Sequence, residues 1–182
     1  MAFDPGPVDA PRARFARHYL RMHHPKICPA ETDRYVDPGA EIPEAFLSFE
    51  RVQPLLDDAR QAVRAVAVEF ARYEFGRWQP PLMALVALAE SRHPEVRELV
   101  AKALSADEHD PDWRDARIDP ARLTPAAVYR FCESTRPEAR DLGMALIAAH
   151  PRLAVPTELF RLTESPDAGV RGFVVRQLWG LY

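Results

Sequence analysis

The chain has 182 residues, of which 47% are hydrophobic and 28% are charged, a balance that suits one globular domain with an apolar core. Its net charge of −3 argues against a nucleic-acid-binding protein, because such domains are usually basic. No stretch is apolar over the about 20 residues of a membrane span, and the N-terminus lacks the apolar run of a signal peptide. Two cysteines without a repeated spacing favour a reduced, cytoplasmic protein.

Residues 10–24 are predicted to form a helix, because Phe15, Tyr19 and Met22 recur at helical spacing. Pro25 ends this helix and opens a proline-rich connection without a clear period. We expect residues 1–42 to pack as a cap on the remainder of the chain.

Three residues near the end of this helix have side chains that suit zinc. His24 and Cys28, with Asp33 nearby, offer nitrogen, sulfur and oxygen ligands. Their spacing matches no standard zinc module, so we expect no metal and no cofactor.

From residue 43 onward, one short pattern occurs four times. In each copy an acid precedes an arginine by seven positions: Asp57 and Arg64, Glu90 and Arg97, Glu133 and Arg140, Glu164 and Arg171. Apolar residues before each acid and after each arginine match one face of a first and of a second helix. We therefore predict stacked helical hairpins, with turns near 57–64, 90–97, 133–140 and 164–171 and an insertion at 105–123.

This pattern resembles HEAT repeats and their bacterial HEAT-like relatives, over roughly residues 43–182. The resemblance implies an all-α fold, a right-handed α–α superhelix whose second helices line a concave surface, here with an N-terminal capping helix. It implies binding more often than catalysis. The first copy is the weakest match, because Pro54 is expected to kink or split its first helix.

The repeated acids and arginines have two interpretations. One is a row of arginines that binds a ligand. The other is a ladder of ion pairs across the turns, together with helix caps, that holds adjacent repeats in register. We favour the ladder, because a binding site usually breaks a repeat rather than following it.

The outward face of the second helices is the first candidate surface for a partner. Its residues are Glu95, Glu98, Lys102, Glu138, Asp141 and Arg176. This mixed, slightly acidic set suits either a solvated face or a groove for a basic or mixed-charge protein segment. Nucleic acid would require a basic row, so we do not expect it as a partner.

The last helix is the second candidate surface, because its outer stripe is apolar. Val175, Trp179 and Tyr182 recur at helical spacing, where a terminal repeat should be polar. Three interpretations remain open. A further repeat of a longer solenoid covers the stripe, a homodimer or another partner buries it, or the aromatic side chains fold back onto their own hairpin.

Motifs of catalysis are lacking: no glycine-rich phosphate loop, G-x-S-x-G or H-E-x-x-H occurs, and Cys132 is expected to be a small core residue. We therefore expect a non-catalytic protein–protein interaction scaffold, a module of a larger bacterial assembly or polypeptide. The alternative is a nucleic-acid- or ligand-handling enzyme on the same scaffold, similar to alkylpurine DNA glycosylases or phycobilin lyases. No motif places either activity at a particular residue.

Overall fold

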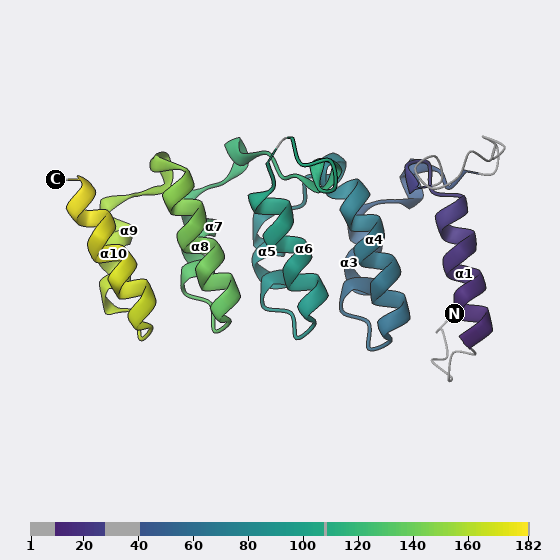
Figure 1. Cartoon of the computed structure of the whole chain (residues 1–182), viewed down its shortest axis with the longest axis horizontal. Coiled ribbons are helices and arrows are strands. Elements are labelled where there is room, and N and C mark those ends of the chain that lie inside the picture. Colours follow the sequence, from purple (N-terminus) through teal and green to yellow (C-terminus); the bar gives the residue numbers. More distant parts are fainter. Residues whose placement is uncertain (1–9, 28–40, 108, 182) are drawn as a thin grey trace. The chain divides into compact units, whose positions relative to one another are not determined.

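The computed structural model describes residues 10–27, 41–107 and 109–181 (Figure 1). These residues form helices and connecting turns without a strand, which confirms the all-α prediction for this part of the chain. The chain divides into two compact units, residues 1–73 and 74–182. None of the described helices combines the length and the apolar character of a membrane span.

The first unit contains α1 (Ala10–Met22), the short 3-10 helix η2 (Glu44–Phe46), α3 (Phe49–Leu56) and most of α4 (Gln61–Trp78). The expected split at Pro54 does not occur, because only two residues follow it before α3 ends. The core register of α3 also differs from the prediction, because the repeated pattern places Leu55, two positions before Asp57, in an apolar core column. Leu55 is 39% exposed and Leu56 is fully buried, since Leu56 continues the helical stripe that Phe49 and Val52 begin.

Helix α1 packs on α4 within this unit. The Arg21 Nε donates a hydrogen bond of 2.6 Å to the Glu69 carboxylate, and the Lys26 ammonium donates one of 2.7 Å to the Tyr73 carbonyl. His24 is fully buried, with its ring centroid 4.8 Å from that of Phe70. This side of α4 is therefore covered by α1 and by the residues directly after it.

The second unit contains three helical hairpins among its described residues. They are α5 (Leu82–Ala89) with α6 (Pro94–Ser105), α7 (Pro125–Cys132) with α8 (Pro137–Ala149), and α9 (Pro156–Arg161) with η6 (Leu162–Glu164) and α10 (Ala168–Leu181). Proline opens four of these helices, where its missing N–H has no intrahelical partner to lose.

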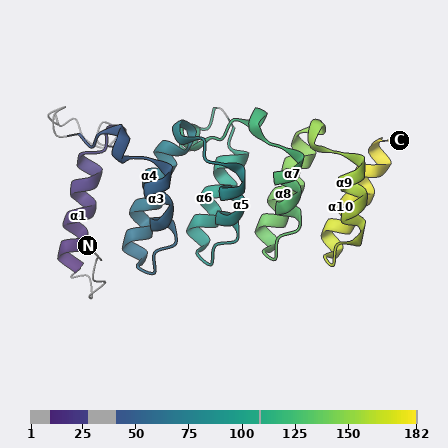
Figure 2. The ribbon, with the colours of Figure 1, turned by 180° about the vertical axis from the view of Figure 1, so that it is seen from behind.

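The hairpins of the second unit stand side by side, as Figures 1 and 2 show from opposite sides. Helix α6 packs on α8, α8 packs on α10, and α5 packs on α7. The repeated apolar positions supply the core between them: Leu85, Val128 and Leu159 in the first helices are all fully buried.

The insertion between α6 and α7 packs back on the hairpin that precedes it. It contains two 3-10 turns, η3 (Arg114–Ala116) and η4 (Pro120–Arg122). Ala116 and Ile118 are buried, and the Ile118 amide donates a 2.9 Å hydrogen bond to the Ala103 carbonyl of α6. The insertion is therefore part of the core of this unit.

Candidate protein interaction surface

The four repeated arginines each bind the turn that precedes their own helix. In each copy, Nη1 donates to carbonyl oxygens five or six positions earlier. The acceptors are Asp58 and Ala59 for Arg64, Ser91 for Arg97, Ser134 and Thr135 for Arg140, and Ser165 and Pro166 for Arg171, at 2.6–3.1 Å. The fork of donors on a guanidinium suits this task, because it satisfies neighbouring carbonyl groups that no helix amide reaches.

Two of these arginines also bind a carboxylate of the following hairpin. The Arg97 Nη2 lies 3.3 Å from the Glu138 Oε1, and the Arg140 Nη2 lies 2.9 Å from the Asp167 Oδ2. The repeated arginine therefore joins its own turn to the next repeat, which differs from the predicted ion pair across one turn.

The repeated acids reach the following hairpin as well. The Glu90 carboxylate accepts a 3.1 Å hydrogen bond from the Thr135 hydroxyl, and Glu133 forms an ion pair with Arg161. Within the described part of the second unit, the acid and the arginine of one copy do not pair with each other. The copies at 90–97 and 133–140 instead each offer one acceptor and one donor to the hairpin that comes next.

The carboxylates that receive these arginines stay ionised at neutral pH. The pKa of Asp167 is lowered chiefly by the amide of Val170, which donates a 3.0 Å hydrogen bond to it at the start of α10, and Arg140 lowers it further. The pKa of Glu138 is lowered first by its own backbone amide and then by Arg97. Helix capping and the bonds between hairpins therefore use the same carboxylates.

A cavity of about 370 Å³ lies between the turn at 133–135 and the turn at 164–167. Its polar lining includes Arg140, Arg161 and Asp167, which already bind across the two hairpins. Cys132 also lines it, and burial raises the pKa of this thiol to about 12, so that it stays protonated at neutral pH. The cavity is thus a gap in a structural contact, without an activated nucleophile.

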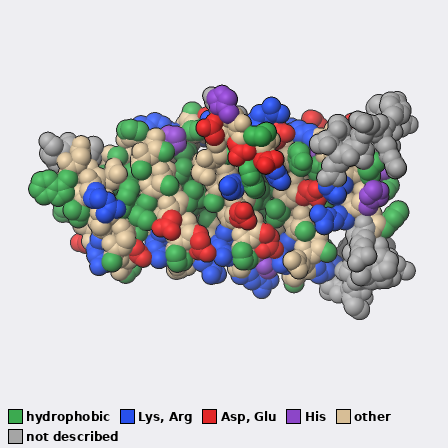
Figure 3. Space-filling model, in the orientation of Figure 1, with side chains coloured by type: hydrophobic (Ala, Val, Ile, Leu, Met, Phe, Trp, Pro, Cys, Tyr) green, Lys and Arg blue, Asp and Glu red, His purple; other side chains and the backbone are tan. Residues whose placement is uncertain are grey.

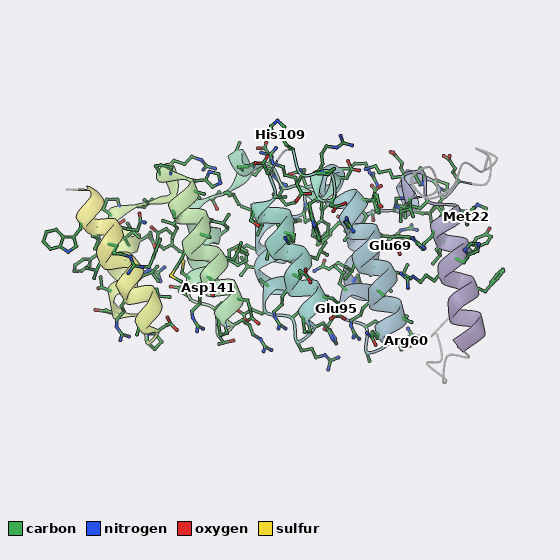
Figure 4. The ribbon with its side chains drawn as sticks, viewed as in Figure 1. Met22, Arg60, Glu69, Glu95, His109 and Asp141 are labelled. Atoms are coloured by element: carbon green, nitrogen blue, oxygen red, sulfur yellow. The ribbon has the colours of Figure 1, made fainter. Side chains whose placement is uncertain are left out.

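The outward face of the second helices is acidic in the second unit. Figure 3 shows acidic side chains gathered over α6 and α8, and Figure 4 labels Glu95 and Asp141 on these two helices. Glu98, Lys102, Asp141 and Arg176 are exposed, whereas Glu95 is half-buried. Glu138 forms an ion pair with Arg97. The predicted set therefore contains both solvated charges and groups that hold hairpins together.

The last hairpin carries a second set of exposed side chains, which we call the end face and define as Phe160, Glu164, Arg171, Val175 and Trp179. Trp179 is 79% exposed, Phe160 is 70% exposed and Val175 is 47% exposed. Apolar side chains gather at this end of the second unit in Figure 3. Tyr182, the third member of the predicted stripe, lies outside the described residues.

Sequence reasoning missed Phe160, although the repeat contains a signal for it. Phe160 directly follows the buried Leu159, as Tyr129 directly follows the buried Val128 one repeat earlier. Tyr129 is only 1% exposed, and its hydroxyl donates to the Leu153 carbonyl in the connection to the next hairpin at 3.2 Å. The same position is thus covered in an internal repeat and uncovered in the last one.

The three residues whose side chains suit zinc, His24, Cys28 and Asp33, do not form a described site. No three His, Cys, Asp or Glu side chains come together as metal ligands in residues 10–27, 41–107 and 109–181. Cys28 and Asp33 lie outside these ranges.

Comparison of the chain with protein-family models, with curated proteins and with solved structures found no match.

Proposed function

We propose that the chain is a HEAT-like, right-handed helical solenoid that serves as a non-catalytic protein-interaction scaffold in a larger bacterial assembly. The four copies of one acid–arginine pattern and the side-by-side hairpins of the second unit support the solenoid. The observation that carries the interaction role is the end face, where two large aromatic side chains are mostly exposed. Exposed apolar clusters of this kind are typical of protein-binding surfaces.

The contacts between the internal hairpins support this proposal. The α7–α8 hairpin buries Tyr129 at the position of Phe160, and the following hairpin places Asp167 on Arg140, the equivalent of Arg171. The outward face of α6 and α8 is a weaker candidate, because Glu138 is already paired there.

Site-specific photocrosslinking in the cell that makes the protein tests this proposal. A photoreactive amino acid is placed at Trp179, at Glu98 on the outward face of α6, and at Met83, which is 56% exposed on α5. We expect discrete protein adducts from position 179 and none from position 83. Adducts from position 98 alone would move the binding surface to the second helices, and no adduct from any position would contradict the scaffold role.

A further inference from the structure

We propose that the end face binds the end face of a second copy of this chain. The two copies form a closed, two-fold dimer in which Arg171 of each copy pairs with Glu164 of the other. This inference rests on the proposed function, because it names the partner of the same surface.

The internal contacts between hairpins provide the first step. The acid column supplies an acceptor to the next hairpin, as Glu90 and Glu133 do. The arginine column supplies a donor, as Arg97 and Arg140 do. The hairpin that covers α5–α6 and the one that covers α7–α8 each meet an acid and an arginine together.

In the last hairpin, the acid and the arginine of the pattern have no partner from another described hairpin. The Glu164 side chain is exposed and forms no hydrogen bond or ion pair within the described part of the chain. Arg171 is exposed and binds only the carbonyl groups of Ser165 and Pro166, with no carboxylate among the described residues. The end face thus presents one acid and one arginine that each lack the charged or polar partner found in the internal repeats.

Two-fold symmetry satisfies both groups at once. In an isologous contact, residue i of one copy meets residue j of the other, and the reverse contact forms as well. A face that carries one unpaired acid and one unpaired arginine is therefore complementary to itself. A partner that offers only carboxylates would satisfy Arg171 and leave Glu164 facing like charge. This charge complementarity selects a second copy over a purely acidic partner.

The apolar side chains of the end face supply the anchors. Trp179 and Phe160 are 79% and 70% exposed, and Val175 lies one helical turn before Trp179. Tryptophan is among the residues that carry most of the binding energy in protein interfaces, especially where surrounding contacts exclude water. In the dimer these side chains pack beside the two reciprocal ion pairs, and the contact closes after two copies because both use the same surface.

Sedimentation equilibrium of the full chain over a broad concentration range tests the dimer. We expect wild type to be a monomer–dimer system whose dissociation constant rises with salt. Trp179→Glu is expected to abolish the dimer. Arg171→Glu and Glu164→Arg each place like charges together at two points, so each is expected to weaken dimerisation by about tenfold or more. The double variant Arg171→Glu with Glu164→Arg restores complementarity and is expected to return to within about threefold of wild type.

Two controls separate binding from folding. Glu164→Arg leaves the carbonyl bonds of Arg171 intact, so it reports on the interface even if Arg171→Glu perturbs the turn; circular dichroism checks the fold of each variant. Arg114→Glu reverses an exposed charge on η3, outside the end face, and is expected to leave the dissociation constant unchanged. A wild type that stays monomeric, a dimer insensitive to both Trp179→Glu and Glu164→Arg, or an open-ended series of oligomers each overturns the inference.

The crosslinking adduct from position 179 distinguishes failure of the dimer from failure of the proposed scaffold function. An adduct of two copies supports both. An adduct with another protein alone overturns the dimer and leaves the scaffold role standing. The absence of adducts from every tested position overturns both.

Discussion

Gly143 marks the closest approach of the two helices in the α7–α8 hairpin. A Cβ at this position would lie 2.7 Å from the Cys132 Sγ and 2.8 Å from the Cys132 backbone nitrogen. Because that nitrogen belongs to helix α7, it cannot yield without a shift of the helix. We expect Gly143→Ala to lower the free energy of unfolding by about 1–3 kcal/mol, measured by urea denaturation.

Gly180 provides the matched control for this substitution. It lies near the end of α10, and a Cβ there would meet nothing within 4 Å. Gly180→Ala should therefore leave packing unchanged and raise the free energy of unfolding by about 0.4–1 kcal/mol, because alanine restricts the unfolded chain. If both substitutions stabilise the protein equally, the tight packing of α8 on α7 is wrong.

At the scale of elements, Tyr129 attaches α7 to the connection between α8 and α9. Its hydroxyl lies 3.2 Å from the Leu153 carbonyl and accepts a hydrogen bond of 3.2 Å from the Val155 amide. Tyr129→Phe leaves these groups without their partner, so we expect a loss of about 1–2 kcal/mol in the free energy of unfolding. Tyr19→Phe, at a side chain that is 51% exposed, is the control and should change stability little.

The ionisation of Tyr129 gives this prediction a second readout. Burial raises the pKa of Tyr129 to about 12, from an ordinary value of 10.0. The native state thus favours the protonated phenol, and this contribution to stability is complete below pH 10.0 and is lost as the pH rises toward about 12. Ultraviolet absorbance should show a late-titrating tyrosine in wild type that is missing from Tyr129→Phe. An early titration of every tyrosine would contradict the buried hydroxyl.

The periodicity of the sequence predicts which face of each element is buried. Leu85, Val128 and Leu159 are core residues because apolar side chains at helical spacing must share one side of a helix. The same periodicity failed by one position in α3, where Leu56 rather than Leu55 enters the core. Two adjacent leucines leave the register undecided until the packing of α3 selects one of them.

Contacts between elements are less accessible to sequence reasoning. Glu90 and Arg97 belong to one copy of the repeated pattern, which suggested that they form an ion pair. Each of them instead binds a residue of the next hairpin. Spacing along the chain fixes the helix face on which a side chain lies, and the stacking of the hairpins then determines its partner across the interface. Phe160 was missed for the same reason, because its exposure depends on the presence or absence of a neighbouring hairpin rather than on its own helix.

At the scale of the second unit, the hairpins differ in how many neighbours support them. In an array of repeats, the free energy of unfolding is approximately the sum of a contribution from each hairpin and a contribution from each contact between adjacent hairpins. The α7–α8 hairpin contacts described helices on both sides, through α6 and α10, whereas α10 contacts described helices on one side only. Local opening should therefore begin at the last hairpin.

Hydrogen exchange followed by mass spectrometry measures this gradient. We expect the amides of α10 to exchange faster than those of α8 in dilute protein, because α10 opens without disrupting an internal contact on its outer side. Occupation of the end face by a second copy adds the missing neighbour, so the protection of α10 should rise with protein concentration while that of α6 stays constant. In Trp179→Glu the rise should disappear. Equal exchange in α8 and α10 at low concentration would mean that the last hairpin is supported by something other than its neighbour, and the assignment of the end face as an uncovered surface would then fail.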